Sequence, residues 1–139
     1  MKNLWIAIVL MLFFAGFAVA QPTISGPQSG ILGPGEYIVT GDLSIVDGAT
    51  LTIEPGTTIL FDGSFNFTID ANDVLIAQGT ETDSIRFMPN TDNGFAHWGH
   101  IVLEGSASDD ILEYCLITGG NTNNGGGIQI SQTSPTISN

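Results

Sequence analysis

The sequence predicts an all-β protein built from short strands in a repeating pattern. Outside the first twenty residues, no segment has apolar residues at helical spacing. Apolar residues occur instead in pairs at positions i and i+2, which is typical of a strand with one buried side. Turn-forming sequences such as Asp47-Gly48, Pro55-Gly56 and Asp62-Gly63 separate these pairs.

Residues 1–20 are predicted to be a secretory signal peptide. Lys2 precedes an uncharged, mostly apolar stretch that ends in Ala18-Val19-Ala20, a pattern of small residues at which such peptides are cleaved. The alternative is an uncleaved membrane anchor, for which this stretch has about the minimum length. The chain is therefore expected to be secreted or displayed on the cell surface, with no membrane span after cleavage.

The charge of the chain excludes several functions. The 139 residues include 14 acidic and only 2 basic side chains, a net charge of −12. All 14 acidic residues follow Ala20 and Lys2 is lost with the signal, so Arg86 is then the only strong cation and the net charge is −13. A nucleic-acid interface needs a basic surface, and a phosphate loop needs a lysine. The single cysteine, Cys115, precludes an internal disulfide and is expected to act as a small apolar core residue.

Residues 21–40 contain Pro22, Pro27 and Pro34 and are expected to form an N-terminal lead-in or cap. The strand pattern follows in residues 41–139. Its first pairs are Leu43/Ile45, Leu51/Ile53, Ile59/Phe61, Phe67/Ile69, Leu75/Ala77 and Ile85/Phe87.

The spacing of the pairs predicts how the strands associate. The first five pairs begin eight residues apart, so every third pair recurs after 24 residues. Three short strands repeating at this interval would form one coil of a parallel β-helix, a solenoid in which each strand lies on its equivalent in the next coil. The expected partners are residues 43 and 67, 51 and 75, 59 and 85, 101 and 128, and 112 and 137.

A β-sandwich or meander is the alternative fold. Strands at this spacing also occur there, and the Asp-Gly turns suit hairpins. Hydrogen bonding distinguishes the two folds, because a hairpin pairs consecutive strands antiparallel, whereas a β-helix pairs strands one repeat apart.

A series of strand-like segments follows in order along the chain: 48–61, 77–80 with 85–87, 98–101, 112–117, 125–130 and 134–139. These segments resemble bacterial right-handed parallel β-helix repeat proteins, which have the pectate-lyase-like fold. The resemblance covers residues 35–139 and implies a right-handed parallel β-helix of about four short coils. No capping sequence follows the last strand-like segment, so the chain is expected to be the N-terminal fragment of a longer protein. Because this fold supports many activities, the resemblance does not specify the chemistry.

Some acidic residues are candidates for catalytic groups or calcium ligands. Asp92 with Asp109-Asp110 resembles the carboxylates of polygalacturonases, but the histidine motif lies on the wrong side of the aspartate pair and the family's lysine is missing. Arg86 is the only candidate base for a lyase and is expected to point outward from its strand. Asp70, Asp73, Asp109 and Asp110 are weak calcium candidates, although solvated turn residues are the favoured interpretation.

Trp98 is the candidate for carbohydrate contact, through stacking on a sugar ring. The alternative, which the resemblance favours, is packing at the start of a strand. His97 and His100 are expected on opposite sides of that strand, so no metal site is assigned to them.

The favoured function is non-enzymatic: a secreted or cell-surface β-helix scaffold or adhesion module that contacts polysaccharides or surface glycans, with no catalytic residue and no required cofactor. The rival is the N-terminal part of a polysaccharide lyase or glycoside hydrolase whose active site lies beyond Asn139.

Overall fold

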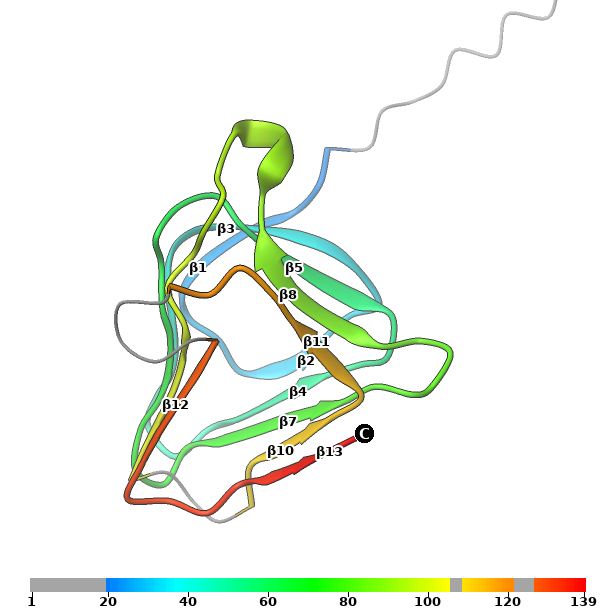
Figure 1. The fold of residues 1–139 in the computed structure, drawn as a ribbon. Helices are drawn as coiled ribbons and strands as arrows, with labels where there is room; N and C mark the ends of the chain where they lie inside the picture. Colours follow the sequence, from blue (N-terminus) through cyan, green and yellow to red (C-terminus); the bar gives the residue numbers. More distant parts are fainter. Residues whose placement is uncertain (1–19, 106–108, 122–126) are drawn as a thin grey trace, which may run out of the picture.

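The computed structural model describes residues 20–105, 109–121 and 127–139 (Figure 1). The regular secondary structure of this part of the chain consists of β-strands and one 3₁₀ turn, η1 (Thr91–Asn93), between β8 and β9. The strands are β1 (Thr23–Pro27), β2 (Gly30–Leu32), β3 (Gly35–Ile45), β4 (Thr50–Ile53), β5 (Thr57–Phe61), β6 (Phe67–Ile69), β7 (Val74–Gln78), β8 (Ile85–Pro89), β9 (Ile101–Glu104), β10 (Ile111–Glu113), β11 (Cys115–Ile117), β12 (Ile128–Ser131) and β13 (Thr136–Ser138).

Two sheets surround a common interior. The larger sheet has the order β11-β8-β5-β3-β6-β9-β12, with β1 also paired to β3, and the smaller has the order β13-β10-β7-β4-β2. The long strand β3 pairs with β5 through its first half and with β6 through its second half. The larger sheet therefore curls at β3 into two rows of strands, and the smaller sheet forms a third row (Figure 1).

Within residues 20–105, 109–121 and 127–139, every strand pairing is parallel and none joins strands that are consecutive in the chain. The hairpin pairing that a meander requires is thus not observed among these strands. The protein is all-β with parallel sheets, as the spacing predicted.

Four of the five predicted partnerships are confirmed. Leu43 pairs with Phe67, Leu51 with Leu75, Ile101 with Ile128 and Leu112 with Ile137. The fifth is wrong by two residues, because Ile59 pairs with Phe87 and not with Ile85.

The fifth register differs because Thr57 also faces inward. Thr58 pairs with Arg86, so Thr57 lies level with Ile85, and its side chain is fully buried. The Thr57 hydroxyl donates to the Glu54 carbonyl oxygen at 2.6 Å, which satisfies its hydrogen-bonding capacity away from water. A polar residue can therefore hold an inward position that alternation of apolar residues alone does not reveal.

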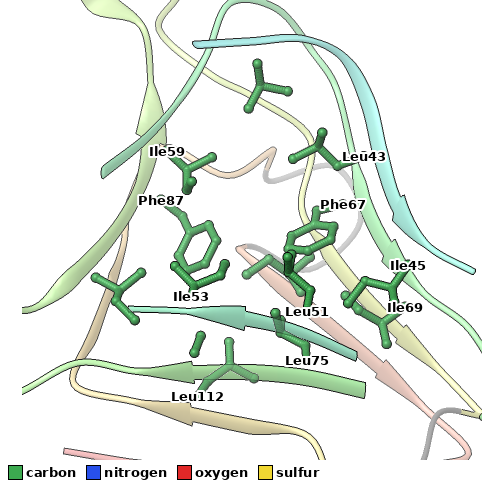
Figure 2. Packing of buried hydrophobic residues seen from close by; sticks show 14 of the residues in the cluster. Leu43, Ile45, Leu51, Ile53, Ile59, Phe67, Ile69, Leu75, Phe87 and Leu112 are labelled. Carbon is green, nitrogen blue, oxygen red and sulfur yellow. The ribbon is translucent and has the colours of Figure 1, made fainter. Parts of the chain in front are cut away.

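The core consists of the inward side chains of the three rows. The labelled residues in Figure 2, including Leu51, Phe67 and Phe87, converge on the interior from different strands. Residues in register stack on one another, so Leu43 lies next to Phe67, and Phe67 next to Ile101, all at most 3% exposed. Parallel sheets with such stacks bury a continuous apolar interior.

The segment 21–40 contains regular structure of its own. Strands β1 and β2 and the first half of β3 lie here, and β1 pairs with β3 and β2 with β4. The apolar alternation did not show β1 or β2, because their inward positions include Gly26 and Gly30. The signal peptide prediction concerns residues that, except for Ala20, lie outside the described ranges.

Candidate functional site

Trp98 lies three residues before the start of β9, near the end of the long connection from β8. Its side chain is 0% exposed and its ring stacks on that of Phe61, with the ring centroids 4.1 Å apart and the planes at 14°. The indole Nε1–H donates a hydrogen bond to the Thr118 carbonyl oxygen at 2.7 Å. Both the apolar face and the polar N–H of the ring therefore make their contacts within the protein.

This geometry does not fit the sugar-stacking role considered for Trp98. Stacking on a saccharide requires an accessible ring face, and Trp98 has no solvent-exposed surface. The packing alternative fits, because the ring connects β5, through Phe61, to the segment after β11, through Thr118.

Two of the four calcium candidates are buried and hold the backbone, so the expectation of solvated turn residues is wrong for these two. Asp73 is 2% exposed, and its Oδ1 accepts the Gly48 N–H at 2.9 Å. Asp110 is 0% exposed, and its Oδ1 accepts the Leu75 N–H at 2.8 Å. Each carboxylate thus joins segments that are 25 or 35 residues apart in the chain.

The other two candidates, Asp70 and Asp109, are exposed. Among the described residues, no three His, Cys, Asp or Glu side chains are grouped closely enough to hold a metal ion. Asp92 lies exposed in η1, and Arg86 points outward from β8, as expected. No cavity is found in the part of the chain that the structure describes.

A series of polar side chains at the start of one row was not predicted from the sequence. Asp42, Asn66 and His100 each directly precede a strand segment in the column Leu43, Phe67 and Ile101. The Asp42 Oδ1 accepts the Asn66 N–H at 2.8 Å, and the Asn66 Oδ1 accepts the His100 N–H at 3.2 Å. We call these three residues the corner ladder.

The signal for the corner ladder is present in the sequence only in part. Asp42 and Asn66 are 24 residues apart and occupy the same position before an apolar pair. His100 follows 34 residues after Asn66, so the equivalence becomes visible only once the pairing of Phe67 with Ile101 is known. His100 is 8% exposed, and its Nδ1 has no hydrogen-bond partner among the described residues.

Replacing Asn66 by alanine is expected to lower the free energy of unfolding by about 1–2 kcal/mol, because the His100 N–H loses its acceptor. Asn66→Asp keeps an oxygen at that position and is expected to cost less. Asp42→Ala serves as a comparison, because its hydrogen bond is exposed and water can replace the lost oxygen. Urea unfolding followed by far-UV circular dichroism measures all three, and a larger loss for Asp42→Ala than for Asn66→Ala would contradict this role.

A further carboxylate joins neighbouring strands of the larger sheet. The Asp62 Oδ1, directly after β5, accepts hydrogen bonds from the side-chain amides of Asn90 at 3.2 Å and Asn93 at 2.7 Å. Asn90 directly follows β8, the neighbour of β5. Asp62 therefore stabilises the start of the β8–β9 connection.

Cys115 is packed against the core, as expected for a small apolar side chain. Its Sγ lies 3.4 Å from the Ala77 carbonyl oxygen. Burial raises the pKa of the thiol from 9.0 to about 11, because the charged thiolate is poorly solvated there.

Alkylation tests this environment directly, since Cys115 is the only cysteine. At pH 8 the native thiol is expected to react about a hundredfold more slowly than the thiol of the urea-unfolded chain, because the thiolate fraction falls tenfold per pKa unit. The folded chain binds the Cys115 thiol proton more tightly than the unfolded chain does. The contribution of this protonated thiol to the free energy of unfolding is therefore complete below about pH 9 and is lost as the pH rises towards 11. Equal rates in the two states would show that the thiol is not buried.

Comparison with known protein families, curated proteins and solved structures finds no match to this chain. None of the helical segments in the described ranges has the length and hydropathy needed to cross a membrane.

Proposed function

We propose that the chain forms a right-handed parallel β-helix that serves as a secreted or cell-surface scaffold and contacts glycans through its outer faces. The observation that carries the proposal is that several acidic side chains form hydrogen bonds within the protein. Asp42, Asp62, Asp73 and Asp110 each accept a hydrogen bond from a group 24–35 residues away. Side chains that hold successive strands together in this way have a structural role.

The β-helix and its handedness are supported by the strand pairing. The strands form three rows, and equivalent residues recur in each row in register. Connections between parallel strands of one sheet are right-handed in nearly all proteins, because a right-twisted strand packs back onto the sheet in that way. A crystal structure of the chain tests both features, and a left-handed path would overturn the handedness.

Neutral glycans are the proposed ligands. One outward-facing register column of the larger sheet contains Ser44, Thr68, Val102 and Gln129 in that order. Apart from Val102, its residues offer hydroxyl and amide groups for saccharide hydroxyls. A chain with 14 acidic residues and 2 basic ones repels polyuronates. Arg86 is exposed on β8 and is the one cation after the signal segment that could attract them.

A glycan array with neutral and acidic saccharides, combined with a uronic-acid release assay, tests this function. The expected result is binding to neutral glycans, unchanged by Arg86→Ala, and no release of uronic acid. Turnover of a polyuronate would instead establish the enzymatic alternative. Binding to no glycan would leave the scaffold role without its proposed ligand and would remove the adhesion part of the proposal.

A further inference from the structure

Among the described residues, two aromatic side chains do not belong to the core. The other aromatic residues are buried or pack against the core: Tyr37, Phe61, Phe65, Phe67, Phe87 and Trp98. Phe95, in the β8–β9 connection, and Tyr114, between β10 and β11, are in neither group, and both are partly exposed. Part of each ring is therefore accessible from outside the protein.

Tyr114 forms the corner at which the chain turns from the smaller sheet into the larger one (Figure 1). β10 ends at Glu113 and β11 begins at Cys115, so Tyr114 is the single residue between these strands. Leu112 is 1% exposed, and Cys115 packs against the core. Glu113 and Tyr114 are thus two consecutive residues outside the interior, where strand alternation alone would turn the second one inward.

The backbone of Tyr114 has a left-handed conformation, with φ of 47°. The other non-glycine residues with positive φ among those described are Asp47, Asn72 and Gln132. Asp and Asn adopt this conformation readily, whereas a bulky aromatic residue is strained in it. Hydrogen bonds on both sides hold the strained residue, since its N–H donates to the Ser138 carbonyl oxygen at 3.0 Å and its carbonyl oxygen accepts the Ile85 N–H at 3.1 Å. Strain that is held in this way is typical of ligand-binding positions.

Two polar side chains adjoin Tyr114 on the outer face of the smaller sheet. Glu113 directly precedes it, and Gln78 is the register partner of Glu113 on β7. The Gln78 Nε2 donates a hydrogen bond to the Glu113 Oε2 at 3.2 Å, in an exposed position. An aromatic ring beside a carboxylate and an amide offers an apolar face for the C–H groups of a sugar and hydrogen-bonding groups for its hydroxyls.

We propose that Tyr114, Glu113 and Gln78 form a binding site for a neutral sugar ring, which stacks on the Tyr114 side chain. This inference rests on the glycan binding proposed above and adds a contact outside the polar column of the larger sheet. The Glu113 carboxylate repels uronic acids, so the site selects neutral sugars. Since no cavity is found in the described part of the chain, the sugar contacts an open surface, and the expected affinity is weak, about millimolar.

NMR spectra of the chain with ¹³C-labelled tyrosine rings test the site directly, because the sequence contains only two tyrosines. The probes are neutral hexasaccharides of β-1,4-linked glucose, mannose or xylose, and hexagalacturonate as the acidic comparison. At least one neutral probe is expected to shift the ring signals of Tyr114, which Tyr114→Phe assigns by their loss. The signals of Tyr37, which packs against the core, are expected to stay in place, and hexagalacturonate is expected to shift neither ring.

Substitutions measured with the neutral probe that binds best separate binding from folding. Tyr114→Ala is expected to raise the dissociation constant about tenfold, and Tyr114→Phe, which keeps the stacking face, to raise it less. Tyr114→Gly removes the ring but adopts the left-handed conformation without strain. It is therefore expected to weaken binding as much as alanine does, while its urea midpoint stays the same or rises. Phe95→Ala is the matched control and is expected to leave binding unchanged, because Phe95 is the other aromatic residue outside the core.

The outcomes distinguish failure of this site from failure of the proposed function. Binding of a neutral probe that Tyr114→Ala does not weaken would overturn the Tyr114 site and leave the glycan-binding function in place. If none of the neutral probes binds, and no glycan binds on the array, the function and the site both fail. A lower urea midpoint for Tyr114→Gly would show that the ring serves packing, and shifts of the Tyr114 signals by hexagalacturonate would overturn the selection of neutral sugars.

Discussion

Replacing Trp98 by alanine is expected to lower the free energy of unfolding by about 3–5 kcal/mol, the usual cost of removing a buried aromatic side chain. The substitution removes a fully buried ring, exposes one face of Phe61 to a cavity and leaves the Thr118 carbonyl oxygen without its donor. Since small domains are stable by about 5–15 kcal/mol, this loss is a large part of the total. Urea unfolding followed by far-UV circular dichroism measures it.

Trp98→Phe separates the two contributions of this side chain. A phenylalanine ring retains apolar contact with Phe61 but cannot donate to Thr118, so the expected cost is smaller than for alanine. If Trp98 stacked on a saccharide, Trp98→Phe would change glycan binding more than stability. A loss below about 1 kcal/mol for Trp98→Ala would contradict the buried stack.

Asp110→Ala is the second substitution with a large expected effect, a loss of about 2–3 kcal/mol. The Leu75 N–H would lose its acceptor inside the protein, and a buried donor without a partner costs more than the hydrogen bond itself contributes. Asp110→Asn keeps an oxygen acceptor and is expected to retain more stability. The measurement is the urea midpoint of each variant.

Asp109→Ala is the matched control, because Asp109 is the adjacent carboxylate and is exposed. Its removal is expected to change the stability by no more than about 0.5 kcal/mol. Equal losses for the two alanine variants would show that Asp110 does not hold Leu75. Stabilisation of the wild-type chain by calcium that Asp110→Asn abolishes would instead favour the calcium interpretation.

The strand pairing could be predicted from the sequence because apolar residues at alternate positions mark the inward side of each strand. The 24-residue repeat then identified Leu43 with Phe67 and Leu51 with Leu75. Alternation cannot distinguish registers that differ by two residues, and it therefore predicts Ile85 as the partner of Ile59 where the structure has Phe87. The observed register depends on Thr57, a buried and hydrogen-bonded polar residue that apolar alternation does not mark.

The roles of the polar residues were less predictable, because each depends on a partner that is distant in the sequence. Asp109 and Asp110 are adjacent, yet one is exposed and the other holds the Leu75 backbone. Asn66 differs in no evident way from other turn asparagines until His100 is placed next to it. For Trp98 the sequence leaves both packing and sugar stacking open, with packing favoured, and the contacts with Phe61 and Thr118 fit packing.

The corner ladder also shows where this protein tolerates changes of length. Asp42 and Asn66 are separated by 24 residues and Asn66 and His100 by 34, yet the same contact is made at both steps. The longer step includes η1 and the connection from β8 to β9, which projects from the stack (Figure 1). Chain can therefore be inserted between strands without disturbing the column of paired residues. The β8–β9 connection is the natural place to graft a foreign loop or epitope onto this framework.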